Sequence, residues 1–140
     1  MKYLLDTCVI SEMIKKHPNK NIVTWIKNSD EDAIFLSVLT IGEIQKDISR
    51  LNDKQRCLQI QRWLDVDLKE RFTQKILPIS VEVALTWGEI EAKALAIGKP
   101  IPSIDGLIAA TALTHNLTLV TRNVKDIKET GVKFLDLWSL

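Results

Sequence analysis

Residues 103–113 constrain the fold more than any other stretch, because they form an apolar run with almost no polar face. The run reads SIDGLIAATAL and follows Pro100 and Pro102, which end the element before it. A helix that is apolar on every side has to lie inside a fold, covered by other elements. Ser103 is a typical N-cap for such a helix, and Asp105 lies in its first turn. The sequence therefore predicts a buried central helix with a carboxylate in its first turn.

Asp105 alone has two interpretations. A carboxylate in the first turn of a helix interacts favourably with the helix dipole, and this structural role is the commoner one for a single Asp. An ionisable group that enters a buried element is also typical of a functional site. The choice depends on which other side chains the fold brings to the same place.

Short apolar runs alternate with longer helical patterns along the whole chain. The expected strands are 3–5, 33–36, 76–79, 117–120 and 132–135. The expected helices between them are 8–14, 22–26, 38–48, 53–72, 81–97 and 103–115. This alternation predicts an α/β fold with a central, mainly parallel five-stranded sheet sandwiched between helices.

Local residues set the expected boundaries of these elements. Thr7 and Ser37 are expected N-caps of the helices after the first two strands, and Gly98 is expected to end the helix 81–97. Pro78 predicts that its strand lies at an edge of the sheet, since proline has no N–H to donate to a neighbouring strand. The many charges of residues 53–72 predict an exposed helical arm or a hairpin of helices.

Composition narrows the class of protein. The 140 residues, 46% of them hydrophobic, are enough for a single domain over 1–140 with its own core. The net charge of +1 excludes a large basic face as the main means of binding a partner. An acid as early as Asp6 argues against a signal peptide, and no apolar run approaches membrane-spanning length. We therefore expect a cytoplasmic protein with no membrane partner.

The cysteines and glycines exclude several kinds of site. Cys8 and Cys57 are the only cysteines, so neither a disulfide framework nor a zinc cluster is expected, and Cys8 is expected to be a small core residue. The five glycines form no phosphate-binding loop, and no Gly-x-Ser-x-Gly nucleophile motif occurs.

Three polar side chains occupy positions that a parallel sheet brings together. Asp6 follows the first expected strand, Asp105 opens the helix before the fourth, and Asn123 follows the fourth. Ligands of open α/β sheets bind at the carboxyl ends of the strands. Carboxylates held close together resist ionising together, and a divalent cation that prefers oxygen ligands, Mg²⁺ or Mn²⁺, removes that cost. The sequence therefore predicts a magnesium or manganese site at this edge of the sheet.

The helical pattern does not select Glu43 for such a site. On a helical wheel the apolar face of residues 38–48 is formed by Val38, Ile41, Ile44 and Ile48. The opposite face carries Glu43, Lys46, Asp47 and Arg50. By periodicity alone, Glu43 is a surface glutamate no different from Asp47.

Four ordered motifs span the chain and read LLDTCVISE (4–12), SVLTIGEI (37–44), IPSIDGLIAATA (101–112) and LVTRNVKDI (119–127). They resemble the motifs of PIN-domain ribonucleases, most closely those of the VapC and FitB-like toxins of bacterial toxin–antitoxin modules. The resemblance covers essentially the whole chain, and it implies a three-layer α/β/α fold and metal-dependent cleavage of RNA. In this interpretation a carboxylate-bound Mg²⁺ activates a water that attacks the phosphodiester.

The resemblance also assigns roles by position. Asp6, Glu43 and Asp105 match the acids that hold the metal, so the resemblance selects Glu43 where the wheel did not. The family often has a fourth acid where this chain has Asn123, which brings no charge and makes a second metal less expected. Asp126 is a nearby carboxylate, although its context suits capping a short helix.

The remaining site assignments concern orientation and substrate binding. Thr7 and Thr121 are expected to orient the carboxylates through their hydroxyls. The candidate phosphate-binding cations are Lys46, Arg50 and Arg122. By the same resemblance the expected partners are an RNA substrate, a cognate antitoxin whose tail crosses the active site, a second copy of the chain, and DNA only through the antitoxin.

Other functions compete with this one. A phospho-accepting receiver domain would need adjacent acids after the first strand, but Thr7 follows Asp6. A catalytically weak PIN-like binding module is supported by Asn123. A nuclease that acts on DNA would use the same metal chemistry, because the metal acts on the phosphate. Trp25, Trp63 and Trp87 are apolar anchors for either a core or an interface.

Overall fold

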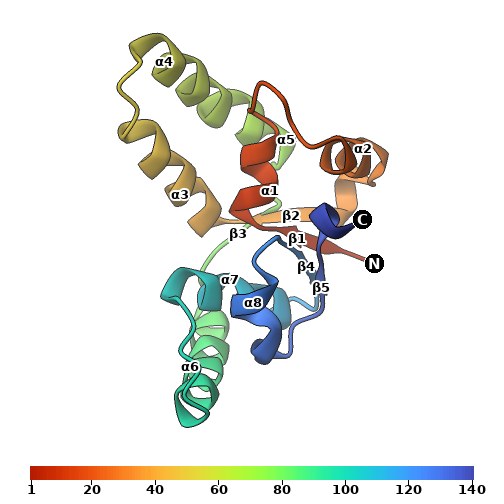
Figure 1. Ribbon diagram of the computed structural model, residues 1–140, viewed down its shortest axis with the longest axis vertical. Helices are drawn as coiled ribbons and strands as arrows, with labels where there is room; N and C mark the ends of the chain where they lie inside the picture. The colour runs from red at the N-terminus through yellow and green to blue at the C-terminus, as the bar shows by residue number, and fades with distance from the viewer.

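The computed structural model describes residues 1–140 and contains a five-stranded sheet in which every pair of neighbouring strands is parallel (Figure 1). The strands are β1 (Tyr3–Leu5), β2 (Ile34–Ser37), β3 (Ile76–Leu77), β4 (Thr118–Val120) and β5 (Phe134–Leu135). Their order in the sheet is β3-β2-β1-β4-β5. The predicted α/β fold is confirmed, and so is the edge position of the strand that precedes Pro78.

Helices cover both faces of this sheet (Figure 1). They are α1 (Thr7–Glu12), α2 (Lys20–Asn28), α3 (Val38–Ser49), α4 (Lys54–Arg62), α5 (Lys69–Arg71), α6 (Val81–Ala96), α7 (Ser103–Thr114) and α8 (Val124–Ile127). Shorter turns are η1 (Glu31–Ala33), η3 (Lys128–Thr130) and η4 (Leu137–Ser139), and a π-helical turn, η2 (Trp63–Leu68), joins α4 to α5. Residues 54–71 thus form one helical segment that packs beside α3 as a hairpin. None of the helices is long and apolar enough to span a membrane.

Alternate residues of the strands divide the core between the two faces of the sheet. Leu5, Leu36 and Val120 pack with α1, α2, α3 and residues 60–72 in one cluster. Leu4 and Leu119 point to the other face, where they pack with α7 and α8. Each layer of helices therefore has its own apolar interface with the sheet.

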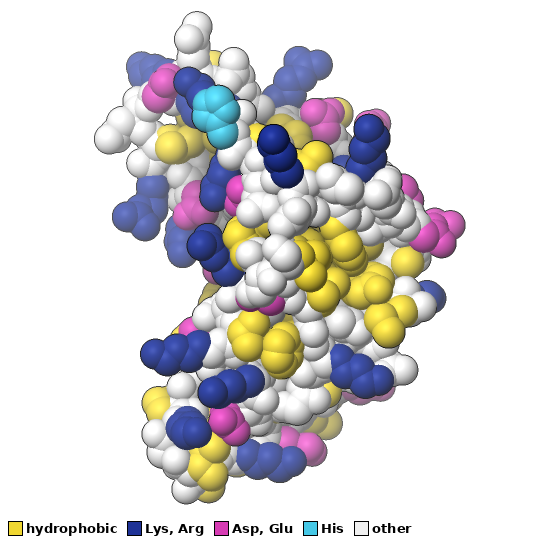
Figure 2. All heavy atoms as spheres, turned by 45° about the vertical axis from the view of Figure 1, so that its right-hand side comes forward, with side chains coloured by type: hydrophobic (Ala, Val, Ile, Leu, Met, Phe, Trp, Pro, Cys, Tyr) yellow, Lys and Arg dark blue, Asp and Glu magenta, His cyan; other side chains and the backbone are white.

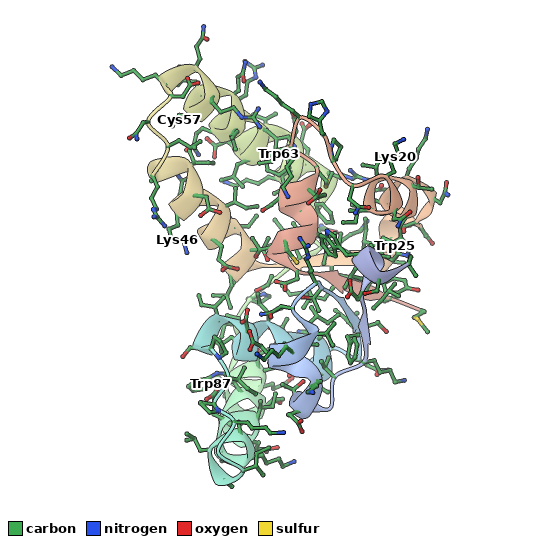
Figure 3. All side chains as sticks on the ribbon, in the orientation of Figure 1. Lys20, Trp25, Lys46, Cys57, Trp63 and Trp87 are labelled. Carbon is green, nitrogen blue, oxygen red and sulfur yellow. The ribbon has the colours of Figure 1, made fainter.

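The apolar run that begins at Ser103 forms the central helix, as predicted. One side of α7 packs on the sheet through Ile108 and Ala109, and another side packs on α6 through Ala110. Gly106 permits close packing, since a Cβ there would lie 2.8 Å from Glu91 Oε1 and 3.2 Å from the Trp87 ring. Trp87 lies on α6, whereas Trp25 and Trp63 pack against the core on the other face of the sheet (Figure 3).

Two predicted caps are confirmed and three are wrong. Ser37 caps α3, and Gly98 follows α6 with a left-handed φ of 69°. The cap of α1 is Asp6 rather than Thr7, because the helix starts directly after β1 and Asp6 accepts the Thr7 N–H. The N-cap of α7 is Pro102, so Ser103 is already helical and makes no capping bond. Asp126 lies inside α8, whose N-cap position is Asn123.

Candidate metal-dependent active site

Acidic side chains from the starts of α1 and α7 and from the middle of α3 surround one cavity of about 370 Å³ at the carboxyl ends of β1 and β4. The lining residues are Asp6, Thr7, Cys8, Glu43, Asp105, Arg122 and Asn123. The structure thus brings together all four residues that the sequence assigned to the catalytic group. A larger cavity of about 560 Å³ lies beside Tyr3 and Trp25 at the other end of β1, and Asp30 is its one acidic side chain.

Asp6 is the most enclosed of the acids that line this cavity, with 8% of its surface exposed. Its Oδ1 accepts a hydrogen bond from the Thr7 N–H at 2.8 Å, and its Oδ2 accepts one from the Thr121 hydroxyl at 2.7 Å. Burial raises the pKa of Asp6, and these hydrogen bonds offset only part of that increase. The Thr121 hydroxyl therefore holds this carboxylate in place.

Glu43 enters the site through a contact that the helical wheel does not show. The Thr7 hydroxyl donates to Glu43 Oε1 at 2.6 Å and lies 3.1 Å from the Thr40 hydroxyl. Glu43 is half-buried, while Asp47, one turn further along α3, is exposed. Proximity to the end of β1, and not helical periodicity, distinguishes the two acids.

Asp105 is the most perturbed acid of the cavity. Burial, followed by the negative charges of Asp6, Asp126 and Glu43, raises the pKa of Asp105 to about 6. A hydrogen bond of 2.9 Å from Asn123 Nδ2 to Asp105 Oδ2 opposes this increase. Asp126 acts on Asp105 through its charge, although it does not line the cavity.

Cys8 packs against the core cluster of α1 and α3, as expected, but it also lines the cavity, which was not expected. It is half-buried, and its Sγ lies 3.9 Å from Asp6 Oδ2 and 4.0 Å from Thr121 Oγ1. Burial and the charge of Asp6 raise the pKa of the Cys8 thiol to about 11, so it stays protonated at neutral pH. Position 8 lies in the first turn of α1, whose amino end faces the cavity. The position of Cys8 two residues after Asp6 is the feature of the sequence that could have predicted its place at the site.

The three candidate cations separate in space. Arg122 lines the cavity, directly after the strand end that carries Thr121. Lys46 and Arg50 lie on the exposed later turns of α3 and do not line it, as Figure 3 illustrates for Lys46. Of the three candidate cations, the structure therefore places only Arg122 in the lining of the cavity.

The sequence matches a known family model over residues 3–133, and that model describes the PIN domain. The chain belongs to the PIN-domain family. Among the relatives of this PIN domain is Toxin FitB of Neisseria gonorrhoeae, 32% identical over 135 residues that cover 96% of this chain and 97% of FitB. Ribonuclease VapC2 of Rickettsia felis is 31% identical over 141 residues, which cover 99% of this chain and 98% of VapC2.

Solved structures agree with the sequence relatives. The crystal structure of FitAcB from Neisseria gonorrhoeae matches this PIN domain with a TM-score of 0.94 at 32% identity, covering 99% of each chain. A second match is the crystal structure of VapBC2 from Rickettsia felis bound to a DNA fragment from the VapBC2 promoter. Its TM-score is 0.77 at 29% identity, and the match covers 96% of this chain and 98% of that one. The predicted resemblance to VapC and FitB-like toxins is confirmed.

The donor atoms of this PIN domain suit a hard cation. No three His, Cys, Asp or Glu side chains lie close enough to enclose an ion by themselves. Mg²⁺ needs no such cage, because it is usually bound by one or two carboxylates and keeps several waters. Asp6 and Asp105 are the carboxylates that would supply those oxygens. Their pKa values are raised where a cation would lower them, and the protonated thiol of Cys8 would compete poorly for the ion.

Proposed function

We propose that this PIN domain is a metal-dependent endoribonuclease and the toxin of a VapBC-type toxin–antitoxin module. One observation carries the proposal: Asp6, Glu43 and Asp105 arrive from three separate segments of the chain and line one cavity. Burial, and then the negative charges of the neighbouring acids, raise the pKa of Asp105 to about 6. Carboxylates that share a site in this way are typical of a bound divalent metal.

Mg²⁺, or Mn²⁺ as the alternative ion, is the cofactor that fits these donors. Asp6 and Asp105 would hold it, and Glu43 would contact it directly or through a water, since Glu43 Oε2 makes no hydrogen bond within the chain. When bound, the ion supplies a Lewis acid that lowers the pKa of water and offsets the charge that builds on the phosphate.

The chain's own residues position these groups before substrate arrives. Thr121 and the Thr7 N–H fix the two oxygens of Asp6, and the Thr7 hydroxyl fixes Glu43. Asn123 orients Asp105 and adds no negative charge to the cluster. A site held by such bonds loses little free energy to reorganisation when a phosphodiester enters.

RNA is the proposed substrate because relatives that cover the whole chain are named ribonucleases. An anionic strand has to approach an acidic cavity, so cations around the cavity are needed to attract it. Lys and Arg side chains gather above and below the indentation on one side of the molecule (Figure 2). Arg122 is the cation that reaches the cavity itself.

The proposed partners follow from the same relatives. We propose a cognate antitoxin that covers the cavity, contact with promoter DNA only through that antitoxin, and a cytoplasmic location shared with the RNA. Solved structures of relatives, such as VapBC2 bound to promoter DNA, support this assembly.

A homodimer is the proposed state of the toxin, and an exposed stripe on α6 supports it. Val81, Leu85 and Leu95 are 77%, 66% and 67% exposed, and Gly88 and Ala92 lie between them on the same side of the helix. A second copy would bury this stripe. We expect Leu85→Lys to shift the chain towards monomer in sedimentation measurements, and a wild-type chain that is monomeric at every concentration would contradict the proposal.

RNA cleavage by the purified protein tests the proposed activity. In Mg²⁺ the wild type should cleave a panel of cellular RNA and transfer RNA, and EDTA should abolish the cleavage. Asp6→Asn and Asp105→Asn should each reduce the rate by about a hundredfold or more, because each removes a charge that holds the ion. Asp67→Asn, a change at an exposed acid of η2, is the matched control and should cleave like wild type.

The same assay separates the alternatives. Cleavage of single-stranded or duplex DNA at a comparable rate would assign the activity to nucleic acid in general. A folded wild type that cleaves nothing in Mg²⁺ or Mn²⁺, or variants as active as wild type, would refute the nuclease and favour a catalytically weak binding module. Inactivity of a folded, metal-loaded wild type would then be attributed to Asn123, which stands where the resembled family often has an acid.

A further inference from the structure

Arg122 lines the acidic cavity, and its guanidinium, whose charge acts on Glu12, has no bonded partner for its own donors. The Arg122 backbone N–H donates to Cys8 Sγ at 3.5 Å, but the side chain forms no salt bridge and no hydrogen bond with the chain. By contrast, Arg71 makes two bonds to Glu31, of 2.7 Å and 3.2 Å. Arg122 therefore presents five free N–H donors, whose fork matches the oxygens of a phosphate.

An aromatic ring from the end of the chain holds this arginine. The Cζ of Arg122 lies 5.5 Å from the centre of the Trp138 ring, within the range of a cation–π contact. A guanidinium held on a ring face keeps its edge donors free, whereas a salt bridge would occupy them. Stacking therefore fixes Arg122 while leaving it able to bind an anion.

The turn that carries Trp138 is itself fixed to the body of the protein. Asp136 caps η4 by accepting bonds from the Trp138 N–H at 2.9 Å and from the Ser139 hydroxyl at 2.8 Å. Leu137 is fully buried in the core beside the sheet. The Trp138 ring is therefore a fixed support and not part of a loose C-terminus.

We propose that Trp138 is a positioning residue that holds Arg122 as a phosphate-binding subsite for RNA next to the metal-binding acids. The inference rests on the proposed function and adds to it the last turn of the chain. The phosphate it binds is one in the RNA backbone, because the cavity acids face the phosphodiester that is cut and Arg122 shares their cavity. Loss of the ring should weaken substrate binding and leave the chemical step unchanged.

Steady-state cleavage of a short single-stranded RNA by point variants tests the role of the ring. We expect Trp138→Leu to raise KM about fivefold with kcat within about twofold, and Trp138→Phe to restore KM because it keeps a ring face. Trp63→Leu is the matched control, since Trp63 packs against the same core cluster but not at the cavity. It should lower the melting temperature without changing KM.

A double-mutant cycle distinguishes positioning from general packing. Arg122→Gln should raise KM at least as much as Trp138→Leu, and adding Trp138→Leu to Arg122→Gln should raise it no further. Additive effects, an unchanged KM in Trp138→Leu, or a Trp138→Phe variant as weak as Trp138→Leu would each overturn the proposal.

Equilibrium binding keeps this test independent of the nuclease assignment. In EDTA, where no cleavage is expected, the Kd for a fluorescein-labelled single-stranded RNA should rise about fivefold in both Trp138→Leu and Arg122→Gln. A wild type that binds this RNA but does not cleave it in Mg²⁺ would refute the proposed nuclease and leave the subsite supported. Equal affinities of wild type and both variants would refute the subsite.

Discussion

A carboxylate is buried at each end of α1, and the pKa values of the two carboxylates are shifted in opposite directions. At the amino end Asp6 is 8% exposed, and at the carboxyl end Glu12 is 5% exposed. Glu12 Oε1 accepts the Asn19 N–H at 2.9 Å, and Glu12 Oε2 pairs with Lys15 Nζ at 2.9 Å. Burial opposes ionisation of Glu12, but the bonds from Lys15 and Asn19 and the charges of Lys15 and Arg122 hold its pKa below the usual value.

Asp6 has hydrogen bonds of similar length but no cation. Its pKa is raised, and that of the nearby Asp105 is raised to about 6. A buried acid with its own cation fixes the chain between α1 and α2, whereas buried acids that face one another need an ion from outside. Burial alone therefore does not identify a functional carboxylate in this fold, and the missing countercharge does.

Removing the charge of Glu12 should have the largest effect on stability. Glu12→Gln takes away the partner of Lys15 and should lower the free energy of unfolding by about 2 kcal/mol, since a buried charged hydrogen bond is lost. RNA cleavage per folded molecule should change little. Denaturant unfolding of Glu12→Gln beside Asp67→Asn measures the difference, and equal stability of the two variants would show that the pair at this end of α1 is unimportant.

Removing the charge of Asp105 should have a smaller effect of the opposite sign. Because the folded pKa of Asp105 is about 6, above its value in the unfolded chain, ionisation of Asp105 lowers stability as pH rises through about 6. In EDTA, Asp105→Asn should therefore be more stable than wild type near pH 7, by about 1 kcal/mol or less after solvent screening, and equally stable near pH 4.

Thermal unfolding of wild type and Asp105→Asn at the two pH values measures this effect. Saturating Mg²⁺ should flatten the pH dependence of the wild type and leave that of Asp105→Asn unchanged, because only the wild type retains both metal-binding aspartates. If wild type without metal is more stable near pH 7 than Asp105→Asn, ionised Asp105 does not destabilise the fold and the interpretation is wrong.

Most of the fold follows from local sequence pattern. Continuous apolar runs predicted β1, β2 and β4. The absence of a polar face on α7 predicted that this helix is buried, and the structure shows that it lies between the sheet and α6. The errors lie at element ends, where one residue decides the cap. Asp6 and Thr7 are both good caps, and the choice between them depends on where β1 stops.

The candidate site divides into parts of different origin. The positions of Asp6 and Asp105 follow from the rule that ligands bind at strand ends. Glu43 does not, since its contact with Thr7 spans 36 residues and leaves no trace in the periodicity of α3. The contact of Trp138 with Arg122 depends on the register of η4, which no local pattern reveals.

The pairing of β1 with β4 has a consequence for the timing of synthesis. Thr121 and Asp6, which are joined by a hydrogen bond, are 115 residues apart in the chain. Contacts of such long range form late in folding, because the loop between them has to close first. Asp6 is made long before its partner strand β4, so it waits for most of the domain to be synthesised before Thr121 can hold it. The residues that precede β4 therefore cannot assemble the proposed nuclease site by themselves.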